Sequence, residues 1–237
     1  MIRTKLKDHC LLGLLTREYR DLILRASPGG KLGPLRSLTP RERYVQAVFE
    51  SVTGLLYACD QSHFAVDLIG GYRRGSAPKG MTRHAYIVFA VENILVRFGM
   101  IADRSLRLVN VVYDLRIPNR ECRKSTIAEN GHVSQTPTAK WLRLIDKAIA
   151  PHRELRNDVV HGASYNDPSL WHLGAFGVLA AEGAVNLEKF ADFVKAEADE
   201  FVRGKRREFK AALARVENPL SGLLDSLNEE VKRRLKC

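Results

Sequence analysis

Hydrophobic residues recur along the chain at the spacing of amphipathic helices rather than with the alternation of strands. Between residues 3 and 25, leucines return every three to four positions with arginine and aspartate between them, which predicts a helix. Thr39-Pro40-Arg41-Glu42 has the form of a capping box with proline at the first helical position. This motif predicts a second helix that begins there and runs into the sixties.

The segment 82–117 is apolar on all sides, and we interpret its first half as a buried helix. Its β-branched residues would also suit a strand, but the segment lacks period-two alternation and is too long for one. Residues 118–137 have no sustained apolar period and are expected to form a long loop of the kind that often carries function.

A further helix is expected between Thr138, as its cap, and Ile149, with Pro151 breaking or restarting it. Gly162 should stop the second piece at His161, because glycine favours the position just past a helix end.

The glycine-rich stretch 168–185 suits either a loosely packed helix or an irregular segment. Asn186 is expected to cap a long helix that Asn218-Pro219 ends before a last helix. The pattern therefore predicts an all-α bundle of six to eight helices without strands. We expect one domain over residues 1–237, with the long C-terminal helices of 186–237 as a possible appendage.

The composition is that of an ordinary globular protein, with 45% hydrophobic and 27% charged residues. The four cysteines are far apart and show no zinc-site spacing, so neither disulfides nor a metal or other cofactor is expected. The first residues lack the apolar core of a signal peptide, and no stretch approaches the roughly 20 apolar residues that cross a bilayer. We therefore expect a cytoplasmic protein without a membrane partner.

A formal net charge of +11 favours a polyanionic partner such as RNA, although a membrane surface or solubility alone would use the same residues. The basic residues that we expect to contact an RNA backbone lie in a glycine-rich loop and in a late helix, where a solvated helix face is the alternative. They are Arg73, Arg74, Lys205, Arg206 and Arg207. Trp141, Trp171 and Phe190 are expected to form core or dimer contacts rather than platforms for bases.

One short run, Arg156-Asn157-Asp158-Val159-Val160-His161, suits catalysis on RNA. In a helix, Arg156, Asn157 and His161 lie at relative angles of about 0°, 100° and 140°, which is one functional arc. An arginine and a histidine at this spacing are expected about 0.7 times by chance in so arginine-rich a chain. An asparagine directly after the arginine lowers this expectation to about 0.03.

The residue types fit metal-independent RNA cleavage. Imidazole titrates near neutral pH, so His161 suits the transfer of the 2′-hydroxyl or leaving-group proton. Arg156 suits binding of the phosphate through two oxygens, and Asn157 suits support of either residue. Glu92 and Asn93 are polar residues in an apolar helix and are expected to support the site or to form a structural pair.

The sequence also predicts the surroundings of Glu92 and His152. If Glu92 is buried, Arg156 or Arg153 is its expected partner, because a buried carboxylate needs one. His152, one helical turn before Arg156, is expected on the surface.

Arg156, Asn157 and His161, in their helical surroundings, resemble the motif of the HEPN superfamily (higher eukaryotes and prokaryotes nucleotide-binding). The resemblance implies a helical homodimer with two motifs lining one cleft, and RNA cleavage that leaves a 2′,3′-cyclic phosphate without a metal. Many members are toxins or phage-defence ribonucleases with an antitoxin or defence-system partner. In toxins controlled by an adenylylating antitoxin, a tyrosine usually follows the histidine by two residues, whereas Tyr165 follows His161 by four.

Two other interpretations stand beside this one. Some HEPN members are inactive modules that bind RNA, a nucleotide or a partner protein. The basic residues can also belong to a helical scaffold that they merely keep soluble.

Overall fold

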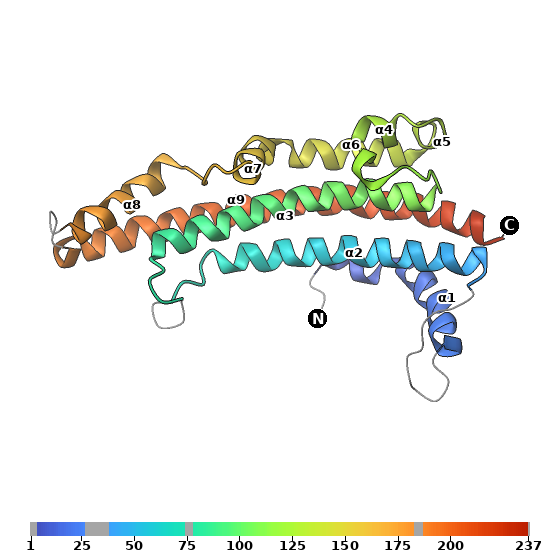
Figure 1. Cartoon of the computed structure of the whole chain (residues 1–237), viewed down its shortest axis with the longest axis horizontal. Helices are drawn as coiled ribbons and strands as arrows, with labels where there is room; N and C mark the ends of the chain where they lie inside the picture. The colour runs from blue at the N-terminus through green and yellow to red at the C-terminus, as the bar shows by residue number, and fades with distance from the viewer. Residues whose placement is uncertain (1–3, 27–37, 74–77, 183–186, 237) are drawn as a thin grey trace. The chain divides into compact units, whose positions relative to one another are not determined.

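The computed structural model describes residues 4–26, 38–73, 78–182 and 187–236. All regular secondary structure in these ranges is helical, which confirms the predicted all-α fold (Figure 1). The chain divides into two compact units. Unit 1 comprises Met1–Asp60, Met100–Ala150 and Arg215–Cys237, and unit 2 comprises Gln61–Gly99 and Pro151–Ala214.

Three long helices contribute residues to both units: α2 (Pro40–Leu68), α3 (Arg83–Val112) and α9 (Leu187–Lys236). The other elements, in chain order, are η1 (Lys5–Asp8), α1 (Cys10–Ala26), η3 (Asn119–Glu121), α4 (Lys124–Ala128), α5 (Gly131–Ser134), α6 (Pro137–Ile149), η4 (Ala150–His152), α7 (Arg153–Val160) and α8 (Pro168–Ala181).

Helix α2 begins at the predicted capping box. The backbone N–H of Thr39 donates to the Glu42 carboxylate over 2.9 Å, and the N–H of Glu42 donates to the Thr39 hydroxyl over 3.3 Å. These two bonds satisfy amide donors that the first turn leaves unpaired. The capping box is therefore confirmed.

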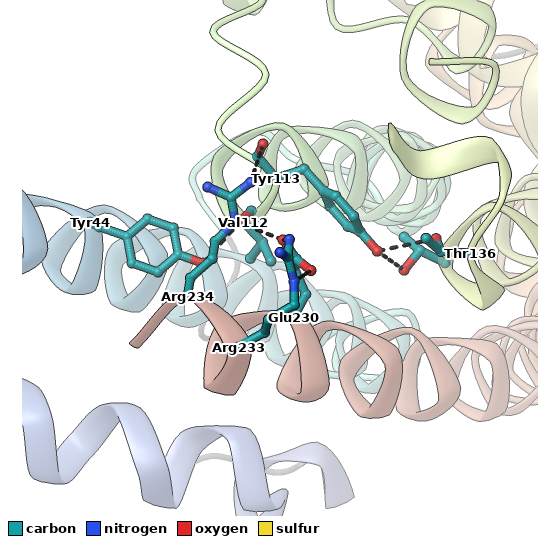
Figure 2. Close-up of polar contacts among 8 residues, drawn as sticks. Tyr44, Val112, Tyr113, Thr136, Glu230, Arg233 and Arg234 are labelled. Atoms are coloured by element: carbon teal, nitrogen blue, oxygen red, sulfur yellow. Dashed lines mark hydrogen bonds and ion pairs between the residues drawn. The ribbon is translucent and has the colours of Figure 1, made fainter. Parts of the chain in front are cut away.

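In unit 1, a Schellman motif ends α3 and neighbouring helices bind its last carbonyls. Asp114 has a left-handed backbone with φ of 46°, and the N–H of Leu115 donates to the Asn110 carbonyl over 3.0 Å. The Tyr44 hydroxyl of α2 donates to the Val112 carbonyl, and Arg234 of α9 donates to the Tyr113 carbonyl (Figure 2). Side chains of α2 and α9 thus bind carbonyl groups at the C-terminal end of α3.

The loop predicted for residues 118–137 is largely replaced by η3, α4 and α5. Ile127 and Val133 are fully buried, so these short helices are packed through apolar contacts that were too brief to give a visible period. Thr138 is not the cap of α6: the cap position is Thr136, and Thr138 is a buried helical residue whose hydroxyl bonds to those of Tyr113 and Ser226.

Helix α9 runs through Pro219, so the predicted end at Asn218-Pro219 is wrong. An internal proline costs about 3 kcal/mol, but the residues that follow it form a fully buried apolar stripe. These residues are Leu220, Leu223, Leu224, Leu227 and Val231. The predicted cap at Asn186 lies outside the described residues.

The core of unit 2 is centred on aromatic contacts between α3, the start of α7 and α9. The imidazole of His152 stacks on Phe98 with a centroid distance of 5.3 Å and lies 5.5 Å from the ring of Phe209. His152 is 8% exposed, so the expectation that it lies on the surface is wrong. His152 is buried because the two faces of its ring are apolar and pack against Phe98 and Phe209 as a small aromatic residue would.

Helix α3 is long and apolar enough to cross a membrane by length and composition, contrary to our expectation for the chain. An 18-residue window has a mean hydropathy of 1.6, and 39% of it is buried. Ile87, Val91 and Phe98 of this helix lie in the core of unit 2, at 0–1% exposure. A core helix of a soluble bundle has the same length and composition.

Candidate functional site

The motif occupies α7, and Gly162 ends this helix as the sequence predicts. Gly162 has φ of +98°, which places it in the left-handed region. The N–H of Ala163 donates to the Asp158 carbonyl over 2.9 Å, as in a Schellman motif. His161 is therefore the capping residue of α7 and stands at a fixed turn.

The side chains of Arg156 and Asn157 contact each other. Arg156 Nη1 donates to Asn157 Oδ1 over 3.2 Å, and both side chains are half-buried. The guanidinium lies directly over Gly99 of α3, since a Cβ added there would come within 2.8 Å of Arg156 Nε and 3.4 Å of Cζ. A glycine in α3 therefore leaves the space that the arginine occupies.

His161 connects to the same pair through the backbone. Its N–H donates to the Asn157 carbonyl over 2.9 Å, while its side chain is exposed. The structure thus joins Arg156 to Asn157 through side chains and presents His161 to solvent at the end of the same helix. An exposed imidazole can exchange protons, and a guanidinium held by a neighbouring side chain can bind a phosphate.

Glu92 supports the segment that follows the motif. Its carboxylate accepts the backbone N–H of Tyr165 over 2.8 Å. This partner is a backbone group, and the expected ion pair with Arg153 or Arg156 stays a prediction. We predicted that Glu92 supports the site from a neighbouring helix, but not that its partner is the backbone N–H of Tyr165.

Tyr165 is the centre of a polar cluster of unit 2. Its hydroxyl donates to Asp167 Oδ2 over 3.0 Å, and Lys205 Nζ lies 3.5 Å from the same oxygen. The Lys205 ammonium also lies 5.9 Å from the centre of the Tyr165 ring. Burial raises the pKa of Tyr165 to about 12, so the phenol remains a donor at neutral pH.

Asn93 and Arg153, which were also expected to support the site, lie on α3 and α7. Asn93 Oδ1 accepts from Nε of Arg97 over 3.1 Å on the same helix, and Asn93 lines an apolar groove with Phe89. Arg153 is the exposed first residue of α7. The structural interpretation of Asn93 fits this position better than a role in the site.

The basic residues expected to contact RNA have different surroundings. Lys205 is 20% exposed in its side chain and pairs with Asp167 and Glu208. Arg206 pairs with Asp67 over 3.3 Å. Arg73 and Arg207 are exposed, and Arg74 lies outside the described residues.

One group of side chains has the composition of a metal site, in unit 1. Ligand atoms of His9, Cys10 and Asp225 lie within 4.8 Å of one another. His9 already accepts the N–H of Leu11 at Nδ1 and bonds to Asp225 at Nε2, so its ring caps α1. Asp225 follows Cys10 by more than 200 positions, so spacing in the sequence gave no sign of this group.

Sequence analysis missed Gly99, Tyr165 and Asp167. A helical glycine gives no chemical signal, and its importance depends on which side chain crosses it. Tyr165 was noted only for its distance from His161. A polar cluster directly after a motif glycine is the one sequence feature that would have indicated it.

The family model described as Cthe2314-like HEPN matches residues 45–214 of the chain. The match includes the whole of unit 2 and part of unit 1. Neither the curated proteins nor the solved structures contain a match to this chain.

Proposed function

Because the chain belongs to the Cthe2314-like HEPN family, we propose that it is a metal-independent endoribonuclease. His161 acts as the general acid or base, Arg156 binds the scissile phosphate, and Asn157 holds Arg156 in place. The reaction is attack of a ribose 2′-oxygen on the adjacent phosphorus. The bond to the 5′-oxygen breaks, and a 2′,3′-cyclic phosphate and a 5′-hydroxyl end are left.

The observation that carries this proposal is the ordered guanidinium of Arg156. It lies against Gly99 and bonds to Asn157, one helical turn before the exposed imidazole of His161. A guanidinium fixed in advance stabilises the charge of the phosphorane without reorganising during the reaction.

We further propose that two chains form a homodimer in which both motifs line one cleft. One α7 presents a single histidine, whereas the reaction needs an acid and a base. Mixing wild-type chains with an increasing excess of His161→Ala chains tests this arrangement. If both histidines are needed, only dimers of two wild-type chains are active, so activity is expected to fall with the square of the wild-type fraction, and a linear fall contradicts a shared cleft.

Cleavage of a labelled single-stranded RNA in EDTA tests the reaction. The wild-type protein is expected to leave 2′,3′-cyclic phosphate ends, and His161→Ala is expected to lose about 10²-fold or more of the rate. His132→Ala is the matched control, because His132 is an exposed histidine of unit 1 and should leave the rate unchanged. Equal cleavage by wild type and His161→Ala contradicts the assignment.

A toxin or phage-defence role in the cytoplasm, with an antitoxin or defence-system partner, extends the proposal. Expression should slow growth, and Arg156→Ala or His161→Ala should relieve this effect. Toxicity that persists in both variants contradicts the role.

The half-buried position of Arg156 favours a second candidate function, a non-catalytic module that binds RNA. In such a module the Arg156–Asn157 contact is structural, and exposed cations such as Arg207 hold the RNA. Salt-sensitive RNA binding without cleavage selects this alternative.

A further inference from the structure

A cavity of about 300 Å³ opens in unit 2 beside the segment that follows the motif. The residues that shape it come from α3, from this segment and from α8. They are His84, Ser164, Tyr165, Asn166, Asp167, Leu170 and Trp171. Its size is at the low end for ligand sites, which suits a fragment such as one nucleoside.

We propose that this cavity binds one nucleobase of an RNA strand next to the cleaved phosphate. The inference deepens the proposed ribonuclease function and rests on it for the identity of the strand. The base stacks on the indole of Trp171, and its edge is bonded by the side chains of His84 and Asn166. Sequence-specific RNA recognition uses this combination of an aromatic face and polar groups on the base edge.

Trp171 supplies the aromatic face. Its side chain is 61% exposed, although an indole is among the costliest side chains to leave in water. Its known ring contact is edge-on with His172, over 5.4 Å. Trp171 is therefore not a core residue of the single chain, while the expected dimer contact stays a prediction, and the exposed ring is available for stacking.

His84 and Asn166 supply hydrogen-bonding groups. Among the described residues, neither side chain forms a hydrogen bond, so their polar atoms are available to a ligand. Burial lowers the pKa of His84, so at neutral pH its ring offers one donor and one acceptor. Such a pair can read a base edge, which also carries donors and acceptors.

Contacts that need no ligand hold the cavity open. Glu92 binds the N–H of Tyr165, and Asp167 accepts the Tyr165 hydroxyl and the N–H of Ser169. Gly174 lets α8 approach His84, because a Cβ there would lie 2.9 Å from His84 Nε2. A preorganised site loses less free energy on binding than one that orders with its ligand.

The charge of the cavity favours a base over a phosphate. Among the described residues that line it there is no arginine or lysine, and the carboxylate of Asp167 is paired with Lys205. Its position favours the base next to the cleaved bond, because Ser164 follows His161 by three residues and lies within about 11 Å of it along the chain.

Tryptophan fluorescence tests base binding without any cleavage. Trp141→Phe leaves Trp171 as the single tryptophan, since the chain has two. Titration of this protein with each of the four nucleoside 5′-monophosphates is expected to give saturable quenching with at least one of them, beyond that of free N-acetyltryptophanamide. Ribose 5-phosphate should give none. Quenching that does not saturate, or that ribose 5-phosphate reproduces, overturns the inference.

Second-site variants separate a pocket from simple stacking on an exposed ring. In the Trp141→Phe background, His84→Ala and Asn166→Ala are each expected to weaken nucleotide binding at least about fivefold, which is 1 kcal/mol. His132→Ala, an exposed histidine of unit 1, should not change it. Equal affinities in all three variants contradict a built pocket.

Cleavage assays separate this inference from the proposed function. Saturable base binding in a protein that cleaves no RNA leaves the pocket standing and rejects the ribonuclease. Cleavage of RNA without saturable base binding supports the ribonuclease and rejects the pocket. If both hold, Trp171→Ala is expected to raise the KM for RNA about tenfold and to reduce the preference among bases at the cleavage site.

Discussion

The guanidinium of Arg156 lies so close over the backbone of Gly99 that a Cβ at position 99 would displace it. An added Cβ would be 2.8 Å from Nε and 3.5 Å from Nη2 of Arg156. These atoms are at the end of the arginine side chain, so a Cβ at position 99 would shift the guanidinium rather than the backbone. The glycine of α3 therefore determines where the motif arginine of α7 lies.

Gly99→Ala is expected to reduce RNA cleavage while the protein stays folded. Alanine is favoured over glycine by about 1 kcal/mol inside a helix, which offsets part of the clash. Displacement of Arg156 by about 1 Å is enough to lower the rate about 10²-fold. The rate of cleavage and the thermal midpoint by circular dichroism are the two measurements.

Gly204→Ala is the matched control for this substitution. Gly204 also lies inside a long helix, and a Cβ there would meet nothing within 4 Å. We expect this variant to be equally or more stable and to cleave RNA at the wild-type rate. Equal rates for Gly99→Ala and Gly204→Ala would show that the position of Arg156 is unimportant.

Gly162→Ala is expected to disturb the turn that presents His161. A residue with a Cβ is disfavoured by about 1–2 kcal/mol at the φ of +98° found here. We expect a lower thermal midpoint, loss of the α7 cap and a reduced rate of cleavage.

Gly80→Ala tests whether strain alone explains that result. Gly80 has φ of +85°, lies in the same unit and has open space around it. Both variants should lose comparable stability, but Gly80→Ala should keep full activity in conditions where it is folded. A parallel loss of activity in the two variants contradicts a specific role for the turn at His161.

Local signals predicted the start of α2 and the end of α7 correctly. The capping box at Thr39 and the glycine after His161 place their groups through backbone bonds a few residues away, so sequence spacing contains the information. Pro219 is the opposite case. The local cost of an internal proline was outweighed by leucines that are buried against distant parts of unit 1, which a local pattern does not show.

The residues of the candidate site also fall into those that local sequence indicates and those that depend on tertiary contacts. Arg156, Asn157 and His161 lie within six residues, so their spacing and residue types were sufficient to propose them as a site. Gly99, Tyr165 and Trp171 act through contacts or exposure that arise only when α3, α7 and α8 are folded. The side chain of Glu92 was found from its polarity in an apolar helix, but its partner is a backbone amide that has no sequence signature.

Glu92→Ala is expected to release the segment after the motif. Tyr165 then loses the acceptor of its backbone N–H, and a buried donor without an acceptor costs about 1–3 kcal/mol. Faster hydrogen exchange at the Tyr165 amide is the direct measurement, and weaker nucleotide binding should accompany it. Glu92→Gln keeps an oxygen acceptor and should restore most of the protection, whereas unchanged exchange in Glu92→Ala contradicts the contact.

The stability of unit 1 is expected to fall in acid through Glu230, which binds Arg233 and Arg234 at 2.6 and 2.7 Å (Figure 2). Burial alone raises the pKa of Glu230, but the hydrogen bonds from the two arginines outweigh burial and hold it below the ordinary value of 4.5. The unfolded chain therefore takes up the proton first as the pH falls. This stabilisation is present above about pH 4.5 and is lost as the pH falls through the folded pKa.

Glu230→Gln should accordingly lower the free energy of unfolding by about 1 kcal/mol at pH 7, since one of the arginines is well exposed and water weakens its contribution. Below pH 4 the difference from wild type should shrink, because the wild-type carboxyl is then protonating as well. Glu229→Gln is the matched control one residue earlier, where the carboxylate is 73% exposed and pairs with Lys232. Urea unfolding at several pH values measures both, and a Glu230→Gln deficit that stays constant down to pH 3 contradicts the proposed charge contribution.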